Sequence, residues 1–334
     1  MANPVQKDQP LSPFFRLQSG VDGPLVSVVL LSYARPHYLM DALGSVVEQS
    51  YRNLEILVVD NRSALSGPVA EIVRKYPRAR LVANSENLGF TGGMNLGIQL
   101  ARGQYVFLTE DDVLLDTDCI SELVRHALNT SGNLLLSGLQ YNRADGLIWS
   151  AGGKISLGSV FRMNVLGRGE PDLGQYQDPF QVNYISGSMV FSSVRLLRQL
   201  GGFRDEFFMY FEDVELCLRA RQQGCVIAVV PTAKEFHFEP PPESRSDVVT
   251  FHALKNFIAT HILHAPSHLL MPFFVRSVLL EFLRCALADP KMAKVWLAAL
   301  RYVCLRGPQL WRERRRLSRA GLCYPAKTDC RIAS

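Results

Sequence analysis

The 334-residue sequence has no pair of cysteines in C-x-x-C spacing, and its seven cysteines are an odd number. These absences argue against a zinc knuckle and a disulfide framework, and they favour a reducing, cytoplasmic environment. The first two dozen residues hold four prolines and no apolar run. We therefore expect no secretory signal, and residues 1–24 are expected to form a flexible lead-in.

The sequence also lacks a clean run of about 20 apolar residues, which a membrane-spanning helix needs. Its most apolar C-terminal stretch, 258–288, is interrupted by histidines, charged residues and Pro272. Residues 269–288 are instead amphipathic, and the net charge of +5 is concentrated in the Arg-rich stretch 311–319. Two arrangements stay open: this region lies on an anionic membrane surface, or it packs on the preceding domain with a solvated basic tail.

Apolar, β-branched runs at 25–33 and 54–61, joined by helical spacing that starts at Pro36, predict a βαβ unit. The alternation continues, and the predicted elements are a helix near 68–76, a strand at 80–83, a helix at about 93–101, a strand at 104–109, antiparallel strands within 134–193, a helix from 213 to about 223 and a strand at 226–231. Three prolines predict an irregular segment at 234–246, and the chain beyond it is expected to be helical. The pattern predicts an α/β fold with a mostly parallel sheet.

Polar residues follow three of the predicted strands, at the sheet edge where α/β proteins bind ligands. They are Ser32 and Tyr33 after the first strand, Asp60 after the second, and Glu110, Asp111 and Asp112 after the fourth. Adjacent carboxylates suit Mg²⁺ or Mn²⁺, which bind oxygen ligands together with substrate phosphates. The structural alternative is that Asp60 caps a turn and that Asp116 and Asp118 cap a helix, which explains the acids at 110–112 less well.

The stretch 87–98 places four glycines at the opening of a helix, where a backbone can approach a phosphate closely. The spacing is neither G-x-G-x-x-G nor a Walker loop, so the dinucleotide and P-loop signatures are missing. Close helix packing explains these glycines equally well. His237 is a candidate metal ligand, although a histidine between two phenylalanines is more often an ordinary packed one.

Two adjacent acids, Glu212 and Asp213, directly follow Tyr210 and Phe211 and begin a predicted helix. Placing carboxylates beside aromatic side chains is costly, because desolvation disfavours their charged form. Asp213 as a helix N-cap is the structural explanation. In the same helix, Glu215 and the residue four positions later, Arg219, are expected to form an ion pair.

Several stretches, in the same order, resemble family 2 glycosyltransferases and particularly their rhamnosyltransferase-like branch. They are VSVVLLSYARP and LEILVVDNRS, NLGFTGGMNLGI, LTEDDVLL, WSAGG, ISGSMVF, GGFRDEFFMYFEDVELCLRARQQG and EFHF, which together span about residues 25–240. The resemblance implies a GT-A type fold: a catalytic domain at 25–245, with a nucleotide-sugar half at 25–133 and an acceptor half at 134–245. A helical, amphipathic and basic C-terminal region would follow at 246–334.

The resemblance also implies roles for individual residues. Donor-side residues would be Ser32, Tyr33, Asp60 at the nucleotide base, Asn87, Gly89, Gly92 and Asn95 by the diphosphate and sugar, Glu110 and Asp111 of the acidic motif, and Asp112 and His237 as ligands of Mn²⁺ or Mg²⁺. Glu110 stands where the family usually has Asp or Asn. Asp213 matches the catalytic base, with Glu212 beside it. A carboxylate base there would activate an acceptor hydroxyl, and its apolar surroundings would exclude water as a competing acceptor.

The function that the resemblance implies is inverting transfer of a sugar, rhamnose among the candidates, from a nucleotide-diphosphate sugar to a hydroxyl of a glycan or lipid-linked acceptor. Such an enzyme would work in cell-envelope polysaccharide synthesis, in the cytoplasm or on the inner face of its membrane. The alternative is a non-catalytic nucleotide-sugar or glycan-binding module, for which we would expect one of Asp60, Asp112 and Asp213 to be missing. A nucleotidyltransferase or a nicotinamide oxidoreductase would have glycines directly after the first strand. Nucleic-acid binding has only the Arg-rich stretch in its favour.

Overall fold

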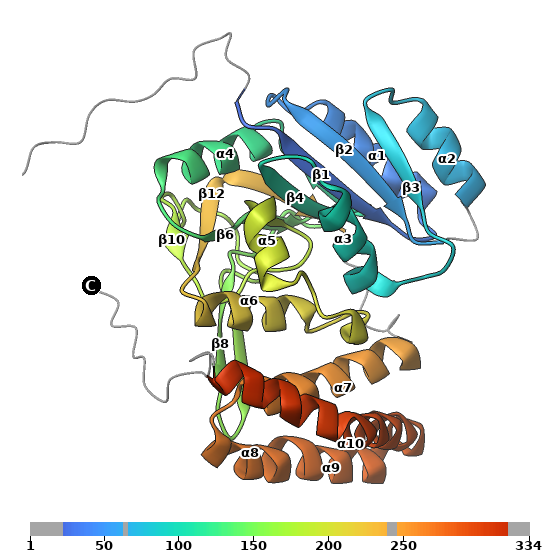
Figure 1. Ribbon diagram of the computed structural model, residues 1–334, viewed down its shortest axis with the longest axis vertical. Coiled ribbons are helices and arrows are strands. Elements are labelled where there is room, and N and C mark those ends of the chain that lie inside the picture. Colours follow the sequence, from blue (N-terminus) through green and yellow to red (C-terminus); the bar gives the residue numbers. More distant parts are fainter. Residues whose placement is uncertain (1–22, 63–65, 239–245, 320–334) are drawn as a thin grey trace, which may run out of the picture.

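The computed structural model describes residues 23–62, 66–238 and 246–319 (Figure 1). Most of the predicted lead-in (1–22), the three prolines at 240–242 and the C-terminal residues 320–334 lie outside the described residues. The five cysteines within the described ranges are free thiols.

One large sheet organises the molecule, with the strand order β10-β12-β6-β11-β4-β1-β2-β3. Its strands are β1 (Val26–Ser32), β2 (Leu54–Asp60), β3 (Ala79–Ala83), β4 (Tyr105–Glu110), β6 (Leu134–Asn142), β10 (Phe180–Gln181), β11 (Val190–Ser193) and β12 (Val226–His237), with β5 (Val113–Leu115) paired to β12 and β7 (Ile148–Ser150) paired to β6. Strands β1 to β4 run parallel to their neighbours among one another, which confirms the predicted βαβ units. Their carboxyl ends therefore meet at one edge.

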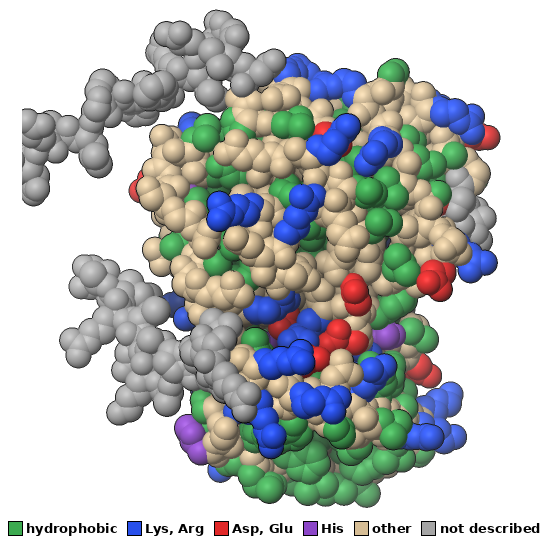
Figure 2. Space-filling model, in the orientation of Figure 1, with side chains coloured by type: hydrophobic (Ala, Val, Ile, Leu, Met, Phe, Trp, Pro, Cys, Tyr) green, Lys and Arg blue, Asp and Glu red, His purple; other side chains and the backbone are tan. Residues whose placement is uncertain are grey.

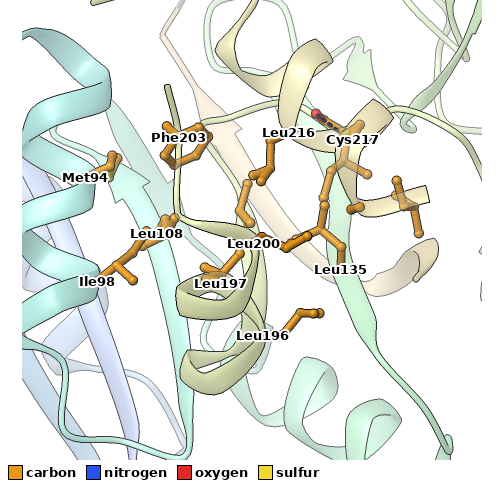
Figure 3. Packing of buried hydrophobic residues seen from close by; sticks show 14 of the residues in the cluster. Met94, Ile98, Leu108, Leu135, Leu196, Leu197, Leu200, Phe203, Leu216 and Cys217 are labelled. Atoms are coloured by element: carbon orange, nitrogen blue, oxygen red, sulfur yellow. Dashed lines mark hydrogen bonds between the residues drawn. The ribbon is translucent and has the colours of Figure 1, made fainter. Parts of the chain in front are cut away.

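Helices cover both faces of this sheet, because side chains along a strand alternate between its two sides. The covering helices are α1 (Pro36–Val47), α2 (Ser66–Arg74), α3 (Gly89–Leu100), α4 (Cys119–Asn129), α5 (Val194–Leu200) and α6 (Glu212–Gln222). In β1, Val29 and Leu31 pack with α3, α5 and α6, whereas Val28 and Leu30 pack with α1, α2 and α4. Figure 3 shows part of the first core, where side chains of α3, β4, α5 and α6 meet. Burial on both faces explains the near-continuous apolar runs of the sequence.

The glycines of α3 bring this helix close to the sheet. A Cβ atom on Gly97 would lie 2.2 Å from Cγ1 of Val29, and one on Gly93 would lie 2.4 Å from Cδ1 of Leu31. The helix begins at Gly89, four residues before the predicted start. Close helix packing, one of the two explanations that the sequence left open, accounts for these two glycines.

Two sequence predictions need correction. The strand predicted at 226–231 continues to His237, so residues 234–237 are not irregular: they pair with β6 on one side and β5 on the other, and the prolines begin only at 240. A register shift between Val230 and Lys234 marks the extension. The region 134–193 is also not purely antiparallel, because β6 runs parallel to β12. Its antiparallel part includes β11 and a separate hairpin of β8 (Gly153–Leu157) and β9 (Phe161–Val165).

The C-terminal region is helical, as predicted (Figure 1). Its helices are α7 (Asp247–His264), α8 (Ser267–Phe273), the π-helix η3 (Phe274–Leu279), α9 (Leu280–Ala288) and α10 (Pro290–Arg319). They share a hydrophobic core that includes Phe273 and Trp296 and also takes in Phe207, from the loop before α6. The C-terminal helices are thus packed on the α/β domain. Within the described ranges, no helix is long and apolar enough to cross a membrane.

Candidate active site

A cavity of about 640 Å³ opens at the carboxyl edge of the sheet, a volume within the usual range for small-molecule sites. Its wall combines Arg35 after β1, Glu110 and Asp112 after β4, His237 at the end of β12, and Glu212 and Asp213 at the start of α6. The β8–β9 hairpin and α7 complete the wall. Residues more than a hundred positions apart in the sequence therefore face one space.

Asp111 is buried below this cavity and anchors the loop after β1. One of its oxygens accepts hydrogen bonds from Oγ of Ser32 at 2.9 Å and from the backbone N–H of Tyr33 at 3.1 Å. The guanidinium of Arg35 lies 2.7 Å from the other oxygen and also pairs with Asp112. Burial raises the pKa of Asp111 to about 6, against the effect of Arg35. Ser32, Tyr33 and Asp111 thus come together, with Asp111 facing the protein interior, and their roles with a donor stay predictions.

Asp112 faces the cavity and lies close to His237. Its Oδ1 has no hydrogen-bond partner among the described residues, and this atom is 3.7 Å from Nε2 of His237. The two residues are joined through the backbone, because the N–H of Phe238 donates to the carbonyl of Asp112 at 3.0 Å. Glu110 lies beside them, and desolvation together with the negative charge of Asp112 raises its pKa to about 8. Carboxylates crowded in this way need positive charge nearby, and Arg35 supplies one such charge to Asp111 and Asp112.

A divalent cation fits the residues at this edge in part. The described residues contain no group of three or more His, Cys, Asp or Glu side chains arranged to hold a metal ion. A buried carboxylate oxygen of Asp112 without a partner, close to an imidazole nitrogen, still offers two ligands. Mg²⁺ is commonly held by one or two protein ligands together with substrate phosphates and water, so two ligands suffice when a diphosphate supplies the rest.

Asp213 lies across the same cavity, held by three hydrogen bonds. Oδ2 accepts from the hydroxyl of Tyr184 at 2.8 Å and from the backbone N–H of Gly187 at 3.3 Å, and Oδ1 accepts from the N–H of Val214 at 2.7 Å. Burial raises the pKa of Asp213, and the bond from Tyr184 opposes that rise. The capping explanation is wrong for this residue, because Phe211 is the N-cap of α6 and no side chain caps the helix.

Glu212 is buried next to Asp213, and its Oε2 lacks a hydrogen-bond partner within the described ranges. Desolvation, followed by the charge of Asp213, raises its pKa well above the ordinary value. Further along α6, the predicted ion pair of Glu215 and Arg219 is confirmed at 2.6 Å. Arg204 and His264 also contact Glu215, which links α6 to the C-terminal helices.

The loop that presents these acids has an unusual backbone. Phe208, Tyr210 and Phe211 all have positive φ, near +66°. Left-handed backbone is unfavourable for residues with a side chain, so other contacts must hold it. The side-chain amide of Asn256 in α7 donates to the carbonyls of Phe207, Met209 and Tyr210 at 2.7 to 2.9 Å. A residue of the C-terminal helices therefore fixes the loop before Glu212.

The remaining predicted donor-side residues lie at the same sheet edge, outside the cavity lining. Asp60 is buried at the end of β2. Asn87 accepts hydrogen bonds from Asn61 and from the N–H of Gly89, while Asn95 bonds to Phe203 and Asp205 and so joins α3 to the loop before α6. A Cβ atom on Gly89 would lie 2.4 Å from the carbonyl oxygen of Phe208, and one on Gly92 would lie 2.6 Å from Cβ of Leu88. The structure brings these residues near one another through packing contacts, and their roles with a donor stay predictions.

Sequence reasoning assigned no role to several residues of this region, although two of them, Arg35 and Asn61, follow the first two predicted strands. The full set is Arg35, Asn61, Trp149, Arg168, Tyr184, Glu235 and Asn256. Glu235 in β12 is buried, and its carboxylate accepts hydrogen bonds from the side chains of Gln140 and Ser188. Burial raises the pKa of Glu235 to about 8. The signal that the sequence offered for Glu235 was an acid inside a β-branched strand region, which was overlooked because residues 234–246 were expected to be irregular.

Comparison with known proteins identifies the family. Residues 27–201, just over half of the chain, match the family described as Glycosyl transferase family 2. The chain is 31% identical over 233 residues to uncharacterized protein y4gI of Sinorhizobium fredii, covering 67% of this chain and 25% of that protein. It is 37% identical over 91 residues to the amylovoran biosynthesis glycosyltransferase AmsB of Erwinia amylovora, covering 26% of this chain and 30% of that protein. The matches thus span a third or less of these two relatives.

Solved structures show the fold. GalNAc-T7, crystallised with UDP, GalNAc and Mn²⁺, aligns with a TM-score of 0.57 at 16% identity, covering 72% of this chain and 49% of that one. TarS of S. aureus aligns with a TM-score of 0.50 at 18% identity, covering 75% of this chain and 43% of that one. At these identities the likeness concerns the fold alone: a GT-A-like α/β fold followed by helices. The sequence match over residues 27–201 shows that the chain belongs to glycosyl transferase family 2.

Proposed function

We propose that this protein is an inverting glycosyltransferase that moves a sugar from a nucleotide-diphosphate sugar to a hydroxyl group of an acceptor. The observation that carries the proposal is that Asp112 and His237 line the same cavity as Asp213. The first two residues provide ligands for a cation beside a diphosphate, and the third provides a base. Family membership supports glycosyl transfer in general.

On the donor side, Asp112 and His237 would hold Mn²⁺ or Mg²⁺, which when bound supplies positive charge to a leaving diphosphate. GalNAc-T7, which has a similar fold, was crystallised with Mn²⁺ and UDP. Arg35 adds a fixed positive charge at the cavity wall, where it pairs with Asp111 and Asp112. Asp60, Asn87, Gly89, Gly92, Asn95 and Glu110 would form the rest of the nucleotide-sugar site.

On the acceptor side, Asp213 would take the proton of the acceptor hydroxyl as its oxygen bonds to the anomeric carbon. The bond from that carbon to the phosphate oxygen breaks, and its electron pair leaves with the nucleoside diphosphate. One displacement of this kind inverts the anomeric carbon. A positioned base contributes roughly a hundredfold or more, and the raised pKa of Asp213 makes its carboxylate a stronger proton acceptor.

We further propose that the acceptor is a glycan or a lipid-linked glycan and that rhamnose is among the candidate donor sugars, following the resemblance to the rhamnosyltransferase-like branch. AmsB takes part in amylovoran biosynthesis, which is consistent with a role in envelope polysaccharides. The place of action would be the cytoplasm or the inner face of its membrane.

The test separates binding from transfer. Asp213→Asn should bind the donor as the wild type does, measured by titration calorimetry, and should lose transfer in a product assay. Screening activated sugars for Mn²⁺-dependent thermal protection identifies the donor first, since a ligand of the folded state raises its stability. Wild-type transfer by Asp213→Asn would refute the role of the base, and donor binding without any transfer by the wild-type protein would favour the non-catalytic binding module.

A further inference from the structure

The helix formed by α8, η3 and α9 carries a row of apolar side chains that points away from the protein. The row consists of Met271, Val275, Leu279, Leu283 and Leu287, each at least 41% exposed. Phe274 and Leu280, 47% and 44% exposed, widen it. Soluble proteins rarely expose a contiguous surface of this kind without a partner. We call these seven residues the outer apolar face.

The backbone reduces the winding of this row around the helix. Residues four apart drift by about 40° around an α-helix, because one turn takes 3.6 residues. The middle of the helix, Phe274–Leu279, is instead a π-helix. Its wider turn, with i→i+5 hydrogen bonds, offsets part of that drift. The five side chains spaced by four residues therefore wind around the helix less than they would on a regular α-helix.

The opposite side of the same helix packs on the protein. Phe273 and Val278 are buried in the core of the C-terminal helices, and the ring of Phe273 stacks on His261 at 3.5 Å between centroids. The helix is thus apolar on both sides, although only one side is covered by the described residues. A contiguous row of exposed apolar side chains on a second side of a helix marks an interaction surface. The outer apolar face therefore calls for a partner.

Charge indicates which partner. Between residues 267 and 317 the sequence has ten Lys and Arg residues and three Asp and Glu residues. Figure 2 shows hydrophobic side chains gathered over the α8–α9 end of the molecule, with Lys and Arg side chains around and above them. Arg276 and Arg284 lie on the helix itself, and the side chain of Arg284 is 73% exposed. A second copy of this chain would bring an equally basic surface, whereas an anionic bilayer offers apolar depth and opposite charge together.

We propose that the outer apolar face lies in the interface of an anionic phospholipid bilayer, parallel to the membrane plane, with the surrounding arginines and lysines at the headgroups. This resolves the choice that the sequence left open, because the same helix packs on the protein with one side and on lipid with the other. It rests on different residues from the proposed catalytic site.

The β8–β9 hairpin connects this surface to the cavity. Its turn contacts the helix through Ser159, which accepts hydrogen bonds from Arg276 and Ser277 at 3.4 Å. Its other end contributes Met163 and Val165 to the cavity wall. Strand β9 has five residues and thus spans about 16 Å at 3.3 Å per residue. Resting on the proposed function, we infer that a lipid-linked acceptor reaches the cavity along this hairpin with its lipid in the bilayer.

Vesicle co-sedimentation of the whole chain, without donor or acceptor, tests the membrane contact. The wild type should bind vesicles of phosphatidylcholine with about a quarter phosphatidylglycerol and should bind far less to phosphatidylcholine alone, with release by about 0.5 M salt. The double variant Leu279→Glu/Leu283→Glu should bind at least about tenfold more weakly, because it places charge on the inserted face. Leu173→Glu, at a leucine 84% exposed outside this surface, is the matched control and should bind as the wild type.

Circular dichroism and thermal melting establish that each variant is folded. Anionic-vesicle binding by the double variant equal to that of the wild type would overturn the proposal. So would a wild type that fails to bind vesicles and sediments as a dimer that the double variant does not form, since the face would then join two copies. Because no sugar is present, a failed transfer assay leaves the vesicle result unaffected, and the two proposals can fail separately.

Discussion

Replacing Asn256 by alanine tests whether the C-terminal helices position the proposed base. The loop at 208–211 holds three non-glycine residues at positive φ, each unfavourable by about 1 to 2 kcal/mol. The amide of Asn256 satisfies three carbonyls of this loop. Because the amide NH2 has two hydrogens, it makes about two full hydrogen bonds, and a net 0.5 to 1.5 kcal/mol for each gives a loss of about 1 to 3 kcal/mol in the free energy of unfolding. The loss is thus comparable with the strain of one or two of these residues, so we expect part of the loop to relax.

Relaxation of the loop would move Glu212 and Asp213, which directly follow it, and would leave Asp112 and His237 in place. We therefore expect Asn256→Ala to lower kcat by at least about tenfold, the equivalent of 1.4 kcal/mol in the barrier, with little change in the KM for the donor. Urea unfolding and steady-state kinetics with a screened donor provide the two measurements. Thr250→Ala, on the same helix, is the control, because its hydroxyl bonds only within α7, to the carbonyl of Ser246.

The outcome that refutes the reasoning is specific. If Asn256→Ala loses the expected stability but keeps the wild-type kcat, the loop holds its conformation without the amide, and the C-terminal helices only stabilise the fold. A rise in donor KM with unchanged kcat would place the effect on the donor side instead.

Three further predictions follow from the site. Asp112→Ala should abolish the Mn²⁺ dependence of donor affinity in calorimetry, while Asp118→Ala, exposed on the following loop, should keep it; equal Mn²⁺ dependence in both would remove Asp112 from the metal site. Tyr184→Phe removes the hydrogen bond that lowers the pKa of Asp213, so the acidic limb of the pH–rate profile should shift to higher pH, and an unmoved limb would point to another base. Glu215→Gln should cost about 3 to 5 kcal/mol of stability near neutral pH, because it leaves Arg204 and Arg219 without their buried partner. The surrounding arginines hold the pKa of Glu215 well below its usual value of 4.5. Its contribution is therefore present above that value and is lost as pH falls through the lowered pKa, so the difference in urea stability should shrink in acid.

Local patterns were enough to predict the scaffold. The runs at 25–33 and 54–61 are apolar because their strands are buried on both faces, and this property is visible in the residues themselves. The acids after β4 were found in the same way, because ligand sites follow strand ends. Such signals depend only on neighbours in the chain.

The residues that were missed depend on contacts between distant segments. The side chain of Arg35 is held at the site by ion pairs with Asp111 and Asp112, which lie more than 70 positions later in the sequence. Asn256 is an ordinary polar residue of a predicted helical region until the loop at 207–210 packs against it. The extension of β12 to His237 also depends on pairing with β5 and β6, which overrides the expectation set by nearby prolines.

The residues that line the cavity are made at different times during synthesis of the chain on the ribosome. The strand-end acids are translated first, His237 follows, and the helix α7, which supplies Val249 and Ala253 to the wall, comes later still. Domains generally fold as the ribosome releases them. A nascent chain that has folded its first strands would still have an open, unfinished pocket, so any chemistry on a nucleotide sugar must wait until α7 has emerged and docked.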